Sequence, residues 1–160
     1  EIPAQDIDDV SVSSTKIRRA LAVGNLKTAN RYLGTPFMLS GKVVNGKKLG
    51  GQIGFPTANI DILEDYKLIP KTGVYVVQSE INNKIIFGMM NIGNRPTVSG
   101  THQTIEVHFF DYNNDLYNTF LTIELLFFLR DEHKFDAIEN LILQLKKDEE
   151  TARDYLKKEL

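Results

Sequence analysis

The 160-residue sequence lacks several features that would place it in particular classes of protein. It has no cysteine, which excludes disulfides, a cysteine nucleophile and paired CxxC metal sites. No apolar stretch approaches the length of a membrane span, and no basic head with an apolar run marks a signal peptide. We therefore expect a cytoplasmic protein that does not bind membranes. Because the first residue is Glu1 rather than Met, we also expect a piece of a longer chain.

An excess of charge of one sign is also lacking. Nineteen Lys and Arg residues oppose 21 Asp and Glu residues, which gives a net charge of −2. Such a chain has no overall positive field to attract a polyanion, so nucleic acid is not an expected partner and any phosphate site must be local. The hydrophobic content of 42% is that of a globular domain with a buried core.

Turn residues divide the chain into helical and extended parts. Helices are predicted over residues 15–22 and 25–33, where Gly24 and Gly34 provide the ends. Short apolar segments separated by polar turns then indicate a closed or nearly closed antiparallel barrel. The predicted strands are Phe37–Val44, Val74–Ile81, Lys84–Met90, Ile105–Phe110 and Phe120–Leu129.

A long helix is predicted from residue 135 to the end of the chain, because the apolar residues there recur with helical period. We expect it to pack across the barrel. The residues on its apolar face are Ile138, Leu141, Ile142, Leu145, Ala152, Tyr155 and Leu156.

A glycine-rich segment follows the first predicted strand. Residues 41–48 match most of the phosphate-loop spacing, but Lys48 stands where Ser or Thr should bind magnesium, and no helix is predicted after it. Two interpretations remain: a nest of backbone amides that binds an anion with help from Lys47 or Lys48, and a flexible hairpin tip without a binding role. The glycines of this segment are Gly46, Gly50, Gly51 and Gly54.

The next segment, GFPTAN at residues 54–59, is stiffer. Pro56 fixes its own φ and biases Phe55 toward extended geometry. In an extended chain the side-chain oxygens of Thr57 and Asn59 point to the same side, where they are suited to bind magnesium together with water and substrate phosphates. The alternative is a turn in which both side chains bond only to local backbone.

Glu106 is a charged residue in an otherwise apolar strand. It shares one face of the strand with His108, whereas Ile105 and Val107 lie on the other. A carboxylate flanked by apolar residues is suited to act as a general base, although a solvent-facing position on a half-exposed strand gives the same pattern. His108 has no second His or Cys at ligand spacing, so a zinc site is not expected.

Taken together, these segments resemble the riboflavin kinase family, and in particular the kinase half of the bacterial bifunctional riboflavin kinase and FMN adenylyltransferase, or FAD synthetase. GFPTAN is the most specific match, and the similarity extends from about Gly34 almost to the C-terminus. The other matching segments are GVY at 73–75, NIGNRPT at 91–97, the Glu106 strand, DLY at 115–117, LRDE at 129–132 and KFD at 134–136.

The resemblance implies a mainly β fold, a six-stranded antiparallel Greek-key barrel with a long C-terminal helix and a short N-terminal helical segment. Residues 12–18 look like the last nucleotide-binding motif of an adenylyltransferase domain. We therefore expect residues 1–34 to be a helical remnant of that domain and its linker, and residues 35–160 to be the kinase domain. The histidine-containing transfer motif of the adenylyltransferase is absent, so FAD synthesis is not expected of this chain alone.

The resemblance also implies a role for each candidate residue. Glu106 would be the catalytic base facing the riboflavin 5′-hydroxyl, and Arg130 and Phe135 would bind the flavin with it. Thr57 and Asn59 would hold Mg²⁺ and the nucleotide phosphates. The residues implied for ATP binding are Gly46, Lys47, Lys48, Gly50, Gly54, Phe55, Pro56, Thr57 and Asn59.

The implied reaction is transfer of the γ-phosphate of ATP to riboflavin, which gives FMN and ADP. Its loose transition state asks the protein for positioning and charge neutralisation. One alternative is a flavin- or nucleotide-binding barrel without catalysis, against which Thr57, Asn59 and Glu106 argue. Another is an oligonucleotide-binding barrel, against which the lack of a basic stripe argues. Gly51 stands where the family often has a basic residue, so we expect a neighbouring lysine to replace it or ATP to bind more weakly.

Overall fold

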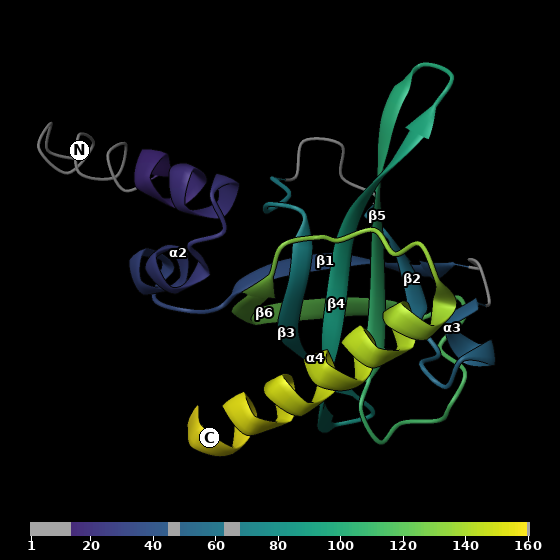
Figure 1. Ribbon diagram of the computed structural model, residues 1–160. Helices are drawn as coiled ribbons and strands as arrows, with labels where there is room; N and C mark the ends of the chain where they lie inside the picture. Colours follow the sequence, from purple (N-terminus) through teal and green to yellow (C-terminus); the bar gives the residue numbers. More distant parts are fainter. Residues whose placement is uncertain (1–13, 45–48, 63–67, 160) are drawn as a thin grey trace, which may run out of the picture.

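The computed structural model describes residues 14–44, 49–62 and 68–159, and its centre is a closed barrel of six antiparallel strands (Figure 1). The order around the barrel is β1-β2-β5-β4-β3-β6. Strands β3 to β6 form a Greek key, because β6 returns to lie beside β3 after three consecutive neighbouring strands. The strands are β1 (Phe37–Val44), β2 (Ala58–Asp61), β3 (Gly73–Ile81), β4 (Lys84–Thr97), β5 (Gly100–Phe109) and β6 (Phe120–Arg130). The predicted fold class is confirmed.

In one of the two hairpins the local sequence determines the backbone conformation, and in the other strand pairing determines it. The β3–β4 hairpin turns at Asn82 and Asn83, as predicted, and their φ values of 52° and 66° are typical of a type I′ turn. The β4–β5 hairpin is longer than predicted, since pairing continues to Thr97 opposite Gly100 and the hairpin projects from the barrel (Figure 1). Pairing along the whole hairpin outweighs the strand-breaking tendency of Pro96.

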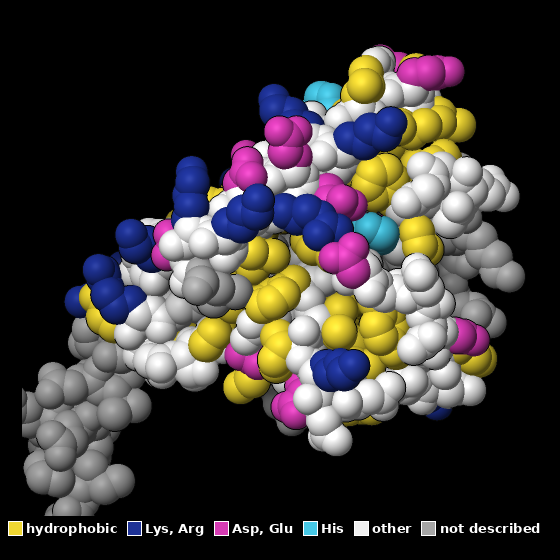
Figure 2. Space-filling model, turned by 90° about the horizontal axis from the view of Figure 1, so that it is seen from below, with side chains coloured by type: hydrophobic (Ala, Val, Ile, Leu, Met, Phe, Trp, Pro, Cys, Tyr) yellow, Lys and Arg dark blue, Asp and Glu magenta, His cyan; other side chains and the backbone are white. Residues whose placement is uncertain are grey.

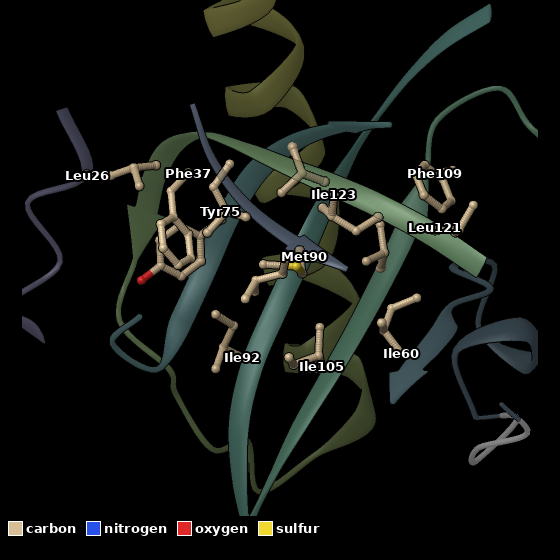
Figure 3. Close-up of a cluster of buried hydrophobic side chains, with 14 of the residues drawn as sticks. Leu26, Phe37, Ile60, Tyr75, Met90, Ile92, Ile105, Phe109, Leu121 and Ile123 are labelled. Atoms are coloured by element: carbon tan, nitrogen blue, oxygen red, sulfur yellow. The ribbon is translucent and has the colours of Figure 1, made fainter. Parts of the chain in front are cut away.

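The interior of the barrel is filled by apolar side chains that alternate with outward-facing ones (Figure 3). Along β1, for example, Phe37, Leu39, Gly41 and Val43 are buried while the residues between them are half-buried or exposed. Tyr75 is fully buried, and its hydroxyl donates a hydrogen bond to the Lys71 carbonyl at 2.6 Å. Burial, with a smaller contribution from a nearby carboxylate, raises the pKa of Tyr75 well above its ordinary value.

Two short helices close one end of the barrel. The first covers residues 14–22, and the second is α2 (Leu26–Leu33), which ends at Gly34, as predicted. Asn25 is its N-cap, and Gly34 has a left-handed conformation. The Asn30 side chain joins α2 to the barrel by donating to the Leu125 carbonyl at 2.9 Å and accepting from the Phe37 amide at 2.8 Å. Residues from both helices complete the core: Ala20, Leu21, Leu26 and Ala29.

The C-terminal helix α4 (Ile138–Glu159) packs on the outer face of the barrel, as expected. A second buried cluster forms there, in which Ala152 packs with side chains from β3, β4 and the segment before β2. Ile138 was predicted on the packed face but is 51% exposed, because α4 meets the barrel only after its first turn. Figure 2 shows basic and acidic side chains interspersed along this helix. Within the described residues, none of the helices combines the length and apolar character needed to cross a bilayer.

The segment after the first strand corrects one expectation. A one-turn helix, α3 (Leu49–Gln52), follows the glycine-rich residues where no helix was predicted. Two glycines lower its intrinsic propensity, so its sequence gives no helical signal. Gly54, which comes shortly after α3, has a φ of 90° that favours glycine and starts the GFPTAN turn.

Candidate functional site

The strand register aligns residues of five strands in one row on the outer face of the barrel. Glu106 of β5 lies opposite Asn59 of β2 on one side and opposite Asn91 of β4 on the other. Asn91 in turn lies opposite Val74 of β3, which lies opposite Arg130 of β6. Directly opposed residues place their side chains on the same face, about 5 Å apart. The row therefore brings together three predicted site residues that are distant in sequence.

A cavity of about 400 Å³ lies beside the Asn59 end of this row. Thr57 and Asn59 both line it, together with Ala58 between them. The loop before β6 adds Asp115, whose carboxylate accepts the Tyr117 amide at 2.9 Å and so orders this part of the lining. Hydroxyl, amide and carboxylate oxygens are the ligands that suit a hydrated magnesium ion and phosphates. The other lining residues include Gly51, Pro56, Asn113 and Asn114.

A second cavity, of about 320 Å³, lies along the middle of the row. Glu106, Arg130 and Phe135, the residues predicted for the flavin side, all line it. The wall of this cavity consists largely of apolar side chains, with several charged groups among them. The other lining residues include Ile53, Phe55, Met89, Asn91, Arg95, His108, Glu132, His133, Leu141 and Leu145. An apolar pocket with a few polar groups suits a planar organic ligand such as a flavin ring.

Thr57 lines both cavities. It precedes β2, between the turn at Pro56 and the first strand pairing at Ala58 opposite Val107. A hydroxyl at this position can meet a ligand in either cavity. Ligands bound in the two cavities would therefore both lie against Thr57.

Arg130 makes a buried ion pair with α4. Its Nε and Nη2 atoms donate to the Asp148 carboxylate at 2.8–3.1 Å, and its Nη1 atom donates to the Asp131 carbonyl at 3.0 Å. Asp148 is 1% exposed and also accepts from Gln144 at 2.8 Å. Since every guanidinium nitrogen of Arg130 already donates a hydrogen bond, much of its binding capacity is used to hold the helix against the barrel.

Residues 131–137, here called the flap segment, border the second cavity and connect β6 to α4. The Asp131 carboxylate forms an ion pair with Lys71 at 2.7 Å, which fastens the start of the segment. Glu132 approaches Gly93 so closely that a Cβ atom on residue 93 would lie 2.5 Å from its Oε1 atom. The rings of His133 and Phe135 contact edge to face.

The remaining predicted ATP-binding residues are distributed unevenly. Pro56 lines the first cavity, but Phe55 is buried and lines the second. Gly50 belongs to α3, and Gly54 is the left-handed residue of the turn. The other three, Gly46, Lys47 and Lys48, lie outside the described residues.

Several residues of the site were missed by reasoning from the sequence. Asn91 and Asp115 fall in recognised segments, yet nothing in their local pattern indicated a role. The signal that would have found Asn91 is the pairing of its strand with the Glu106 strand. Asp148 was missed because its partner Arg130 is 18 residues away, across a change from strand to helix.

A family model described as Flavokinase, riboflavin kinase, matches residues 33–156. The bifunctional riboflavin kinase/FMN adenylyltransferase of Listeria monocytogenes is 44% identical over 148 residues, which are 92% of this chain and 47% of the relative. That of Haemophilus influenzae is 41% identical over 150 residues, which are 93% of this chain and 48% of the relative. The chain thus spans about half the length of these curated relatives.

Two solved structures are also similar. One, described as a macrolide-efflux protein from Streptococcus pneumoniae, has a TM-score of 0.82 and 41% identity, and the match covers 88% of this chain and 46% of that one. The other is riboflavin kinase from Trypanosoma brucei, with a TM-score of 0.53 and 27% identity, where the match covers 78% of this chain and 82% of that one.

Proposed function

Because the chain belongs to the riboflavin kinase family, we propose that it transfers the γ-phosphate of ATP to the 5′-hydroxyl of riboflavin. The observation that carries the proposal is the pair of cavities that share Thr57, one lined by oxygen ligands and the other by Glu106 and apolar side chains. Phosphoryl transfer needs its two substrates held in line and the charge between them neutralised. Two adjoining cavities with a polar shared wall meet the first requirement.

We place the nucleotide in the first cavity. Thr57 and Asn59 would hold Mg²⁺ and the phosphates with their side-chain oxygens, and Asp115 lines the same cavity. The bound ion would neutralise negative charge on the phosphates. Gly46, Lys47, Lys48, Gly50, Gly54, Phe55 and Pro56 remain candidates for contact with ATP.

We place riboflavin in the second cavity, where Glu106 would accept the proton of the 5′-hydroxyl. As the oxygen of that hydroxyl bonds to the γ-phosphorus, the bond from this phosphorus to the bridging oxygen breaks and ADP leaves with the electron pair. Asn59 and Asn91 lie opposite Glu106 in the register, so their side chains share its face of the sheet. Phe135 would contact the flavin ring, and Arg130 would help to shape the pocket.

The relatives carry a second activity in their names, FMN adenylyltransferase. For a longer parent protein we propose that activity as well, in a domain that precedes the kinase. The first substrate of that reaction would be the FMN made here.

The proposal is tested by incubating the purified chain with riboflavin, ATP and Mg²⁺ and separating the flavins by chromatography, with and without a chelator. We expect FMN that depends on the metal. Riboflavin left unchanged by a chain that is folded by circular dichroism would reject the kinase and support a barrel that binds flavin or nucleotide without catalysis. An affinity for single-stranded oligonucleotides that falls with salt would support the oligonucleotide-binding alternative.

A further inference from the structure

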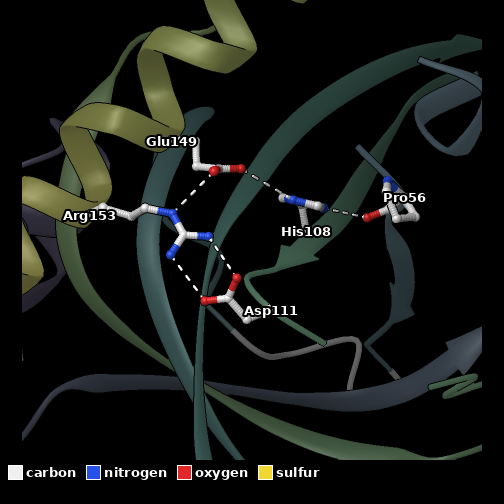
Figure 4. Close-up of polar contacts among 5 residues, drawn as sticks. All are labelled: Pro56, His108, Asp111, Glu149 and Arg153. Atoms are coloured by element: carbon white, nitrogen blue, oxygen red, sulfur yellow. Dashed lines mark hydrogen bonds and ion pairs between the residues drawn. The ribbon is translucent and has the colours of Figure 1, made fainter. Parts of the chain in front are cut away.

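His108 connects two elements that border the site (Figure 4). It lies on β5, lines the second cavity, and has a side chain that is only 13% exposed. Its Nδ1 atom is 2.7 Å from the carbonyl oxygen of Pro56. A carbonyl oxygen can only accept a hydrogen bond, so Nδ1 must carry the proton of this contact.

The ring of His108 is held in place from several sides. It contacts Phe55 and Phe110 edge to face, with ring centroids 5.4 and 5.8 Å apart. Its Nε2 atom is 3.7 Å from Oε1 of Glu149 on α4. These contacts leave the imidazole little freedom to turn, so the direction in which Nδ1 points is fixed by the fold.

Glu149 is itself held by a second pair of groups. Its Oε2 atom accepts from Nε of Arg153 at 3.1 Å, and the same guanidinium donates two bonds to Asp111 at 3.1 and 3.2 Å (Figure 4). The hydrogen bond from Arg153 and its charge hold the pKa of Asp111 below its usual range, so the carboxylate stays charged near neutral pH. The chain of contacts therefore begins at Asp111, after β5, and passes through Arg153 and Glu149 of α4. From Glu149 it continues to His108 and then to Pro56 in the GFPTAN turn.

The contact with Pro56 matters because of the residue that follows. The carbonyl of Pro56 and the amide of Thr57 belong to one planar peptide unit, so fixing the carbonyl also fixes the direction in which the chain enters Thr57. Residues 55–57 lie between the turn and β2, outside the strand. His108 lies on β5, the strand next to β2, and its side chain donates a hydrogen bond to the Pro56 carbonyl. This bond holds the segment that contains Thr57, the residue that lines both cavities.

We propose that His108 is a positioning residue for phosphoryl transfer, which acts by holding the Pro56–Thr57 peptide so that the Thr57 hydroxyl faces the nucleotide phosphates. This inference rests on the proposed kinase function. It differs from a role for His108 as base or metal ligand, because the imidazole acts through its Nδ1–H group on the backbone and not on a substrate.

Two variants separate this hydrogen bond from the loss of the ring. In His108→Asn the amide nitrogen occupies the place of Nδ1, and in His108→Gln it occupies the place of Nε2. Both lack the imidazole, but only the Asn variant keeps a donor where Pro56 needs it. We expect kcat/KM for MgATP to be about tenfold higher in His108→Asn than in His108→Gln, the size expected for one well-made hydrogen bond.

A matched pair of variants at His102, which is exposed on the projecting hairpin, provides the control and should leave both substrates' KM values and kcat unchanged. Calorimetric titration with MgADP tests the route through Thr57 without requiring turnover. The difference in Kd between the Asn and Gln variants should vanish when Thr57→Ala is added to each. A difference that persists in that background, or Asn and Gln variants that behave alike, would overturn the inference.

The unmodified protein gives an independent test that does not depend on how the variants fold. Nitrogen-15 NMR of the histidine ring should show His108 with its proton on Nδ1, and a ring with a bare Nδ1 would reject the proposal. If the unmodified chain makes no FMN, the kinase function fails. If it makes FMN while the two His108 variants are equivalent, only the positioning role fails.

Discussion

At the scale of single residues, Glu106 is the group whose loss should affect chemistry most directly. In Glu106→Gln the amide keeps the shape and the neighbours Asn59 and Asn91 but cannot accept the substrate proton. We expect kcat to fall by about 10²–10⁴, the usual contribution of a general base, while KM for riboflavin changes much less. Steady-state kinetics of FMN formation measure both values.

The control for this change is Glu80→Gln, an exposed carboxylate near the end of β3 that lines neither cavity. It should retain the kcat of the unmodified chain. A Glu106→Gln variant with the same kcat as Glu80→Gln would remove Glu106 from the role of base.

Tyr75 gives a prediction about pH and stability. Its folded pKa is raised far above the unfolded value of about 10, so the unfolded chain loses this proton first and stability falls as pH rises above about 10. Tyr75→Phe should weaken that alkaline fall. At neutral pH it should cost about 1 kcal/mol, because the Lys71 carbonyl loses its donor. Urea unfolding at pH 7 and above pH 10 measures both effects, and an unchanged alkaline slope would contradict the first.

The residues of the site were predictable to different degrees. Thr57 and Asn59 could be placed together because alternation in an extended chain is a local rule. That Glu106 lies opposite Asn59 and Asn91 depends on which strands become neighbours, and this follows from the closure of the barrel rather than from any local pattern. The residues around Asp148 in the sequence are mostly charged, which is typical of a solvent-exposed helix face. Its burial is explained only by its pairing with Arg130, which is distant in the sequence.

At the scale of elements, the helix α4 is held to the barrel by the buried pair of Asp148 and Arg130. Asp148→Ala removes the carboxylate partner of Arg130, whose side chain is 21% exposed, and should cost about 2–3 kcal/mol of the free energy of unfolding. Because Arg130 and the flap segment line the second cavity, the KM for riboflavin should rise more than the KM for ATP. Urea unfolding and substrate titrations measure these effects.

An exposed carboxylate of the same helix, Asp154, is the matched control. Asp154→Ala should change stability by less than about 0.5 kcal/mol. If Asp148→Ala and Asp154→Ala lowered the free energy of unfolding equally, the ion pair between Asp148 and Arg130 would contribute no more to stability than an exposed charge on α4.

Elements were predicted best where the signal is local. The Asn82–Asn83 turn and the end of α2 at Gly34 were found from their residue types alone, whereas Asn25, predicted as the first helical residue, is the N-cap. The outer parts of β4 and β5 and the one-turn helix α3 were missed, because their glycine and proline residues favour turns. The outer parts of β4 and β5 are stabilised by pairing with each other, which local propensity does not include.

At the scale of the whole molecule, the predicted division at Gly34 can be tested by truncation. Leu21, Leu26 and Ala29 lie before it but are buried in the same cluster as the barrel residues. We expect a chain that starts at Thr35 to unfold at lower urea concentration than the longer chain, with a loss of at least about 2 kcal/mol. The single variant Leu26→Ala should show a loss of about 2–5 kcal/mol by itself. Equal stability of the two chains would support residues 35–160 as a self-sufficient domain.

The pairing of β1 with β6 also constrains when the molecule can fold during synthesis. Leu39 lies opposite Ile123, so the barrel cannot close until β6 has left the ribosome. Helix α2 must wait for the same strand, because the Asn30 side chain donates a hydrogen bond to the carbonyl of Leu125 on β6. Helix α2, which precedes the barrel in sequence, is therefore fixed only when β6 has joined it, and until then one edge of β1 and one edge of β3 have no partner strand.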